Sequence, residues 1–279
     1  MFARKIQTVI FGFLAPLFTL VLVYLLTRVP THEGHWGTAF VRLPEIRRVG
    51  RQYRIRHVRD FRYKADGSIA ETRYQDQSYP AKGPARVWLG LSHFAGFGMA
   101  HSFLSFEFED GRYLVASVEA RLRPGQRYAP VQGLFRRFHK MVVLGTEADI
   151  IGLRSHVRRE RVLLYPLELN EAERRGIFIG VLRDVKAIQQ EPAFYNTLLD
   201  NCTTSLLRHD PHNRFWRNLL DYRILLPGHA DGYALQRGWL EAESGLTELR
   251  SEVTIDGGID PREADFSGRI RNRKAASKR

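Results

Sequence analysis

The hydrophobic and polar positions of this chain follow three successive patterns. Residues 6–26 form an uncharged, apolar run near the N-terminus. Between about residues 53 and 167, short β-rich stretches predominate, and several of them alternate between apolar and polar positions. From Phe178 to Ile188, apolar residues recur at helical spacing, which predicts an amphipathic helix. Because the predicted strands come first and the helices later, the pattern predicts an α+β fold.

Local signals mark where several of these elements begin and end. The runs HSFLSFEF and YLVASVEAR flank Asp110-Gly111, which predicts a β-hairpin. Asn170 and Glu173 form a capping-box pattern, so a helix is expected from there to about Gln190. Further strands are expected at YRIRHV (residues 53–58), KMVVL (140–144) and RVLLYPL (161–167), and a short helix at WLEAESGLTEL (239–249).

The apolar run at the N-terminus is long enough to cross a membrane. Ile6 to Leu26 contains 21 residues without a charge, and a helix of about 20 residues spans a hydrocarbon core of roughly 30 Å. The following stretch YLLTRVP offers no small-residue cleavage site, so residues 1–27 are predicted to form an uncleaved transmembrane anchor. Basic residues lie on both sides of the run, and charge alone therefore leaves its orientation open.

The rest of the chain divides into three regions. Residues 28–57 are expected to form a basic juxtamembrane linker and a first strand. The arginines there favour two interpretations equally, a solvated strand face or contact with anionic headgroups. Residues 58–250 are expected to form the folded domain. Residues 251–279 are expected to form a disordered tail, because the stretch after Ser267 carries six basic residues and no acid.

Composition excludes several classes of site. The net charge of +13 favours anionic partners, but no nucleic-acid-binding motif is present, so a membrane surface is the expected partner. A single cysteine excludes an internal disulfide and a multi-cysteine metal site. The sequence has no HExxH, no phosphate-binding glycine loop and no GxSxG. No cofactor and no metal are therefore expected.

The single cysteine, Cys202, is a candidate nucleophile. Asn201 is a good N-cap, which places Cys202 at the first position of a predicted helix. The helix dipole and the free N–H groups there favour a thiolate over a thiol. The same N–H groups could hold an oxyanion during attack on an acyl carbon. The alternative is that Cys202 is simply a small buried hydrophobic residue.

A nucleophilic cysteine needs a base, and the chain has ten histidines. His101 opens the first strand of the predicted hairpin, and His93 is its rival. Glu119 could orient the base only if a one-residue bulge brought it to the face of His101, because a tight turn at Asp110-Gly111 would point it the other way. Ser117 is the alternative on the same face as His101, and Glu119 could instead form purely structural ion pairs with nearby arginines.

Several long motifs resemble a known family. AHSFLSFEFEDGRYLVASVEAR, RYAPVQGLFRRF, EADIIGLR, VLLYPL and FYNTLLDNCTT occur in this order between about Val58 and Thr204. They resemble the Lnb-type N-terminal periplasmic domain family. The resemblance implies a periplasmic domain with a permuted papain-like (NlpC-type) fold, in which an antiparallel sheet packs on helices and the catalytic histidine precedes the cysteine. It also settles the orientation of the anchor, with the domain in the periplasm of a bacterial cell.

The resemblance assigns roles to particular residues. It implies Cys202 as nucleophile, His101 as base and Glu119 as the acidic third residue. The expected substrate-binding residues, Asn201, Arg121 and Ser117, lie within two positions of Cys202 or Glu119. The chain departs from the family pattern at Phe138-His139-Lys140 and at Glu147-Ala148-Asp149, where substrate details are expected to differ.

The family includes a lipoprotein N-acyltransferase, which implies thiol-mediated acyl transfer. The expected function is therefore a thiol acyltransferase or acyl hydrolase anchored in the bacterial inner membrane. It would move acyl groups between phospholipid and a lipoprotein or peptide acceptor. One alternative is a cell-wall peptide amidase or cysteine peptidase that uses the same two residues. Another is a non-catalytic, membrane-tethered binding module.

Overall fold

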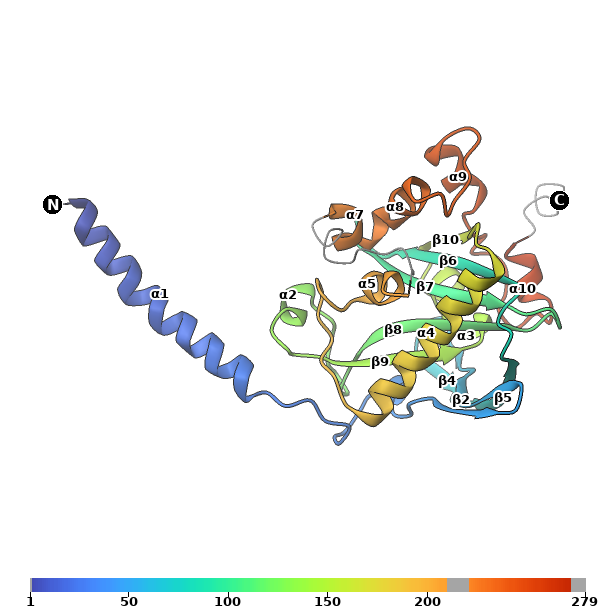
Figure 1. Ribbon diagram of the computed structural model, residues 1–279, viewed down its shortest axis with the longest axis horizontal. Helices are drawn as coiled ribbons and strands as arrows, with labels where there is room; N and C mark the ends of the chain where they lie inside the picture. The colour runs from blue at the N-terminus through green and yellow to red at the C-terminus, as the bar shows by residue number, and fades with distance from the viewer. Residues whose placement is uncertain (1, 210–220, 272–279) are drawn as a thin grey trace.

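A computed structural model describes residues 2–209 and 221–271, with side chains from residue 15 onward except those of residues 206 and 207. A long N-terminal helix, α1 (Phe2–Thr27), projects from a mixed α+β domain (Figure 1). Within residues 2–209 and 221–271, no helix is both long and apolar enough to cross a membrane. The anchor therefore stays a prediction.

The domain is built on one mostly antiparallel sheet of eight strands. Its order is β1-β2-β9-β8-β7-β6-β10, and β5 pairs with the other side of β2. The one parallel contact joins β2 and β9 through Arg59 and Gly145. The predicted strands at residues 53–58, 140–144 and 161–167 correspond to β2, β9 and β10. The strands are β1 (Glu45–Val49), β2 (Gln52–Arg59), β5 (Tyr74–Pro80), β6 (Arg86–His93), β7 (Ala100–Glu107), β8 (Tyr113–Arg121), β9 (His139–Gly145) and β10 (Arg161–Pro166), and β3 (Arg62–Tyr63) and β4 (Ile69–Glu71) form a separate pair.

The predicted hairpin is β7 and β8, but its turn differs from the tight turn that the sequence suggested. Phe108 N–H donates to the carbonyl of Arg112, which leaves a three-residue loop, Glu109 to Gly111. Gly111 adopts a φ of 77°, which a residue with a Cβ rarely adopts. The longer loop shifts the register by one residue, so that Leu104 pairs with Ala116.

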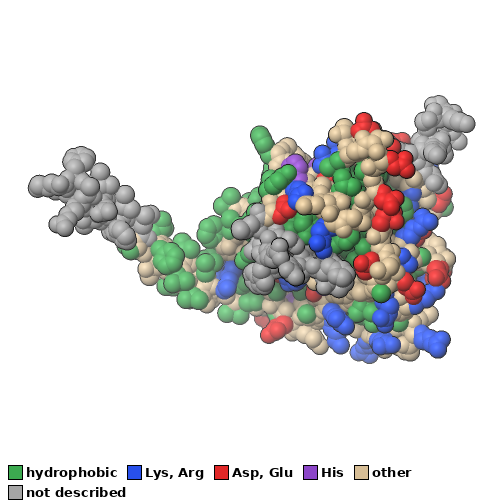
Figure 2. Space-filling model, turned by 45° about the horizontal axis from the view of Figure 1, so that its top comes forward, with side chains coloured by type: hydrophobic (Ala, Val, Ile, Leu, Met, Phe, Trp, Pro, Cys, Tyr) green, Lys and Arg blue, Asp and Glu red, His purple; other side chains and the backbone are tan. Residues whose placement is uncertain are grey.

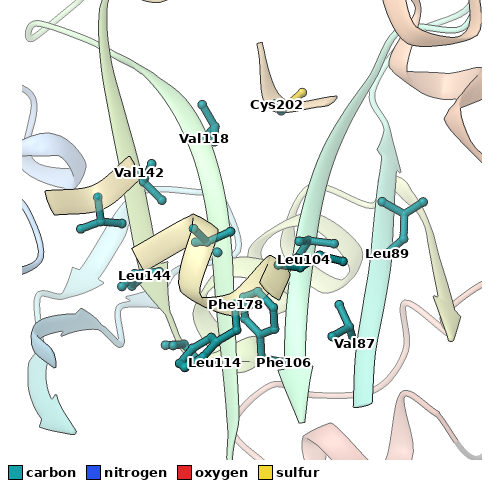
Figure 3. Close-up of a cluster of buried hydrophobic side chains, with 14 of the residues drawn as sticks. Val87, Leu89, Leu104, Phe106, Leu114, Val118, Val142, Leu144, Phe178 and Cys202 are labelled. Carbon is teal, nitrogen blue, oxygen red and sulfur yellow. The ribbon is translucent and has the colours of Figure 1, made fainter. Parts of the chain in front are cut away.

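One face of the sheet is covered by the helix α4 (Glu171–Gln190), as Figure 1 shows. The predicted capping box is present, since Asn170 accepts from the Glu173 N–H and the Glu173 carboxylate accepts from the Asn170 N–H. Phe178 of α4 packs edge-on against Phe106 of β7, with ring centroids 5.2 Å apart (Figure 3). The amphipathic pattern of this helix thus reports a contact with the sheet.

The other face is covered by α3 (Glu147–Gly152), the π-helical turn η2 (Leu153–Val157) and the C-terminal segment with α10 (Phe266–Arg269). Residues 251–271 were expected to belong to a disordered tail, and this part of the expectation is wrong. Ile255, Ile259 and Phe266 are buried against the sheet. These few apolar side chains, spaced along an otherwise polar stretch, are enough to hold the segment in place. The expected tail beyond residue 271 lies outside the described residues.

Short helices complete the domain. The predicted helix at residues 239–249 begins only at Leu246, after Gly245 adopts a φ of 95°. The remaining short helices are η1 (Thr38–Phe40), α2 (Pro130–Gly133), α5 (Cys202–Leu207), α7 (Tyr222–Leu225), η3 (Pro227–His229), α8 (Ala230–Gln236) and α9 (Leu246–Glu252).

The buried contact of the C-terminal segment gives a test of this packing. The Arg271 guanidinium donates to the fully buried carboxylate of Glu147 at 2.6 and 2.8 Å. We expect Arg271→Ala to lower the free energy of unfolding by about 3 kcal/mol, because it leaves a buried carboxylate unpaired. Urea unfolding of the detergent-solubilised chain would measure it.

Arg269→Ala is the matched control, since Arg269 pairs with Glu263 at the exposed surface. Its removal is expected to cost less than about 1 kcal/mol. Equal effects of the two substitutions would contradict the described packing of residue 271.

Candidate active site

The site lies where β7 and β8 move apart. Their ladder ends at the pair Leu104–Ala116, although β7 continues beside β6 and β8 beside β9. Figure 3 shows the two strands diverging, with Cys202 between their ends. The N–H of Ser102 on β7 therefore has no partner on β8, and it donates instead to the Sγ of Cys202 at 3.5 Å. The gap in the sheet thus receives the thiol.

Helix α5 is held in this gap by several polar contacts. The Asn201 side chain accepts from the N–H groups of Thr203 and Thr204 at 2.8 and 2.9 Å, which confirms the predicted N-cap. The Thr203 hydroxyl is 2.9 Å from the Ser102 hydroxyl of β7. Cys202 therefore begins the helix at a defined position and is only 3% exposed.

Before α5, the chain is tied to β9. The buried Lys140 Nζ donates to the Asp200 carboxylate at 2.6 Å and lies 3.2 Å from the Ser205 hydroxyl. Since Asp200 precedes Asn201 and Ser205 lies one turn into α5, one ammonium group fixes both ends of this short segment. The position of the thiol is therefore set from two strands, β7 and β9.

His101 and Glu119 lie on the opposite face of the sheet from α4 and α5. His101 alternates with Ser102, which contacts α5, and shares the face of Phe103, which packs toward α3. The observed register brings Glu119 to the same face, as a one-residue shift of the hairpin was expected to do. The His101 Nε2 is 3.3 Å from the Glu119 carboxylate. The gap between the strands is what lets the thiol meet a histidine from across the sheet.

Ser117 and Arg154 complete the environment of the Glu119 carboxylate. The Ser117 hydroxyl is 2.6 Å from His101 Nε2 and donates to Glu119 Oε1 at 2.7 Å. The Arg154 guanidinium of η2 donates to the same oxygen at 2.9 Å. The carboxylate is therefore held in place by three side chains, and it in turn orients the imidazole.

The electrostatics favour a thiolate–imidazolium pair. Burial alone would raise the pKa of Cys202, but the charge and the hydrogen bond of His101 outweigh it and lower the pKa to about 7. Burial alone would lower the pKa of His101, but the Glu119 carboxylate and the thiolate raise it to about 9. Burial also opposes the charge on Glu119, yet His101 and Arg154 keep the pKa of its carboxyl well below the usual range.

A cavity of about 580 Å³ opens onto these groups. Cys202, His101 and Glu119 line it together with mostly apolar side chains. Tyr128 and Tyr195 form part of its wall, and their rings pack edge-on with centroids 5.8 Å apart. Further apolar wall residues lie in the loops after β6 and β8, at the start of α2 and at the end of α7, among them Phe94, Met99, Leu122, Pro130, Leu225 and Leu226.

The three expected substrate-binding residues occupy different positions. Asn201 lines the cavity, but its side chain is engaged by α5 and by the Thr197 carbonyl. Ser117 is fully buried between His101 and Glu119 and is not part of the cavity wall. Arg121 donates to the carbonyls of Phe40 and Val41 and also lies outside the wall. All three therefore have structural contacts that position the site.

Some residues of the site were not found by sequence reasoning. Arg154, Tyr128 and Tyr195 each lie in one of the motifs EADIIGLR, RYAPVQGLFRRF and FYNTLLDNCTT, which is the signal that could have singled them out. Glu147 and Asp149 of the first motif are fully buried in ion pairs with Arg271 and Arg59, away from the thiol.

Two other possibilities concern His93 as the base and a metal ion held by clustered side chains. His93 pairs with Ala100, so its side chain lies on the face opposite to that of His101. Within residues 2–209 and 221–271, no group of three or more His, Cys, Asp or Glu side chains could hold a metal ion.

The reactivity of the single cysteine tests the pair. We expect alkylation of Cys202 by iodoacetamide to rise with pH through a midpoint near 7, so that the ion pair is most populated between about pH 7 and 9. His101→Ala removes the positive charge while burial remains, so the midpoint should move above the ordinary value of 9. His93→Ala is the control and should leave the midpoint unchanged. A midpoint that did not move in His101→Ala would contradict the pairing.

Comparison with known protein families covers the part of the domain that contains the site. The family model of the Lnb N-terminal periplasmic domain matches residues 70–227, more than half of the 279-residue chain. Searches found no match among curated proteins or among solved structures. The matched region contains His101, Glu119 and Cys202. The chain belongs to the Lnb N-terminal periplasmic domain family.

Proposed function

We propose that the protein is a thiol acyltransferase or acyl hydrolase with Cys202 as nucleophile and His101 as base. The observation that carries the proposal is the pairing of a low-pKa thiol with a raised-pKa histidine on the wall of a largely apolar cavity. Perturbed pKa values of paired groups in a cavity are typical of catalytic sites. The order of histidine strand before cysteine helix fits a permuted papain-like enzyme.

The proposed reaction uses the two groups in turn. The Cys202 thiolate attacks the carbonyl carbon of an ester and forms a tetrahedral oxyanion. The bond to the alcohol oxygen then breaks, His101 gives its proton to the leaving alkoxide, and a thioester remains on Cys202. An amine or water next attacks the thioester, His101 takes the proton, and the thiolate leaves. The product is an amide or a free fatty acid.

Glu119, Ser117 and Arg154 would act through His101. With Nε2 of the imidazole engaged by Ser117 and Glu119, Nδ1 is the ring nitrogen left to face the thiol. The carboxylate would stabilise the imidazolium that forms when the thiol ionises. Arg154 would keep that carboxylate ionised. These three are therefore proposed as positioning residues.

The surface around the cavity supports a lipid substrate. Exposed apolar side chains lie in segments that supply the cavity wall, including Phe97 of the loop after β6, which is 96% exposed, and Val131 of α2, which is 68% exposed. Figure 2 shows hydrophobic side chains of α1 followed by others on the end of the domain next to it. An exposed apolar rim beside a predicted anchor would place the cavity mouth at the periplasmic surface of the inner membrane. Phospholipid is therefore proposed as acyl donor, and a lipoprotein or peptide amine as acceptor.

Covalent capture of the acyl group tests the proposal. The detergent-solubilised chain would be incubated with phospholipid and its intact mass measured. We expect an acyl adduct on Cys202 in the wild type and none in Cys202→Ala. His101→Ala should slow adduct formation by roughly 10²-fold or more, because the base is lost. His93→Ala should react at the wild-type rate.

Other outcomes separate the alternatives. Cleavage of cell-wall peptides that requires Cys202, without any acyl adduct, would favour the amidase or peptidase. Full activity in the cell of both Cys202→Ala and His101→Ala would favour a non-catalytic binding module and refute the enzyme.

A further inference from the structure

A second cavity, of about 390 Å³, lies where the segment after α1 meets the loop between β8 and α2. Its charged and aromatic wall consists of Arg28, Arg123, Arg137, Trp36 and His139. Proline, glycine and glutamine residues of the β8–α2 loop supply the remainder. No acidic residue is among the lining residues, so three guanidinium groups face one space without a counter-charge in its wall.

This second cavity is called the arginine cavity below. Its positive charges are not neutralised by carboxylates elsewhere in the described structure. Within the described part of the chain, Arg28, Arg123 and Arg137 form no ion pair with a carboxylate. The buried Nε of Arg28 has no hydrogen-bond partner. The Nε2 of His139 has none either, although this residue is only 6% exposed. Buried polar atoms are rarely left without a partner, and both of these atoms belong to residues that line the arginine cavity.

His139 is suited to act there as a neutral hydrogen-bond donor. Burial, followed by the charges of Arg123, Arg28 and Arg121, lowers its pKa to about 4. Its ring is held between Trp36, with centroids 5.0 Å apart, and Phe194, with centroids 5.2 Å apart. A ligand in the cavity would thus meet three positive charges and one rigid neutral ring.

An apolar groove continues directly from the arginine cavity. It is lined by Leu20, Val21 and Tyr24 of α1 and by Val131 and Phe135 at α2. Arg137 lines both spaces, so the cationic and apolar surfaces meet at one side chain. Such a junction fits an amphiphile whose anionic group lies beside its hydrocarbon part.

We propose that the arginine cavity binds the phosphate of an anionic phospholipid, whose glycerol and acyl portion lies in the groove against α1. Arginine recognises phosphate oxygens through paired hydrogen bonds. The cavity wall has no carboxylate to pair with a choline or ethanolamine ammonium, which favours an anionic over a zwitterionic headgroup. The loop that carries Arg123 also supplies Leu122 and Tyr128 to the cavity at Cys202. A bound headgroup would therefore orient the mouth of the catalytic cavity toward the bilayer.

Binding can be measured without turnover. The full chain with Cys202→Ala, in non-ionic detergent, would be titrated with phosphatidylglycerol and followed by native mass spectrometry. We expect the tightest lipid-binding step to weaken at least about tenfold in the double variant Arg123→Gln/Arg137→Gln, because two charge-assisted contacts are lost. Phosphatidylcholine should bind less well than phosphatidylglycerol. The result is independent of whether Cys202 transfers acyl groups.

The matched control is Arg47→Gln/Arg48→Gln, which removes the same charge from two exposed positions of β1. It should change the affinity by less than about twofold. If the first double variant does not fold, Arg137→Gln alone serves, since Arg137 is exposed and the structure gives it no hydrogen bond or ion pair. Equal losses in both pairs, or equal binding of the two lipids, would refute the site. Complete displacement of the lipid by millimolar inorganic phosphate would overturn the lipid as its ligand.

Discussion

Beyond Leu104 and Ala116, β7 and β8 share no backbone hydrogen bonds, and the candidate active site is built in the space between them. A closed ladder would bury the N–H of Ser102 against β8 and would separate the two faces of the sheet. The open ladder directs that N–H to the thiol of Cys202 instead. Because a buried N–H without a partner costs about 1–3 kcal/mol, the thiol also satisfies a donor that the divergence of the strands exposes. The open end of the sheet thus needs Cys202 to satisfy the Ser102 N–H, and the site needs the open end to admit the thiol.

The charges at the gap form a chain of contacts that runs from one helical layer to the other. Arg154 approaches from the side of α3, the Glu119 carboxylate and the His101 imidazole follow, and Cys202 approaches from the side of α5. Each charged group in this chain of contacts offsets part of the desolvation cost of burying its neighbour's charge. An isolated thiolate at a position only 3% exposed would be unfavourable. The neighbouring imidazolium lowers the pKa of Cys202 to about 7, so that the thiolate is populated near neutral pH.

The cavity at Cys202, its exposed apolar rim and the arginine cavity all lie toward the end of the domain nearest α1. Exposed apolar side chains surround the mouth of the cavity at Cys202, and the arginine cavity lies beside the segment that leaves α1. The β8–α2 loop contributes to both cavities, so the two lie within a few residues of each other along the chain. The proposed orientation, with the mouth of the catalytic cavity toward a bilayer, rests on this arrangement, and the family match adds only that the domain is periplasmic.

The sequence by itself determined the family, the β7–β8 hairpin, the capping box of α4 and the N-cap that places Cys202 at the start of α5. The family rests on several motifs in a fixed order, and the other features depend on residues within a few positions of one another, so sequence patterns report them directly. Only the tertiary structure decided the register that brings Glu119 beside His101, since this depends on one extra residue in a turn. It also decided the contact of Arg154 with Glu119 and the packing of residues 253–271 on the sheet. These contacts join segments that are distant in the chain, and hydrophobic periodicity carries no information about which of them meet.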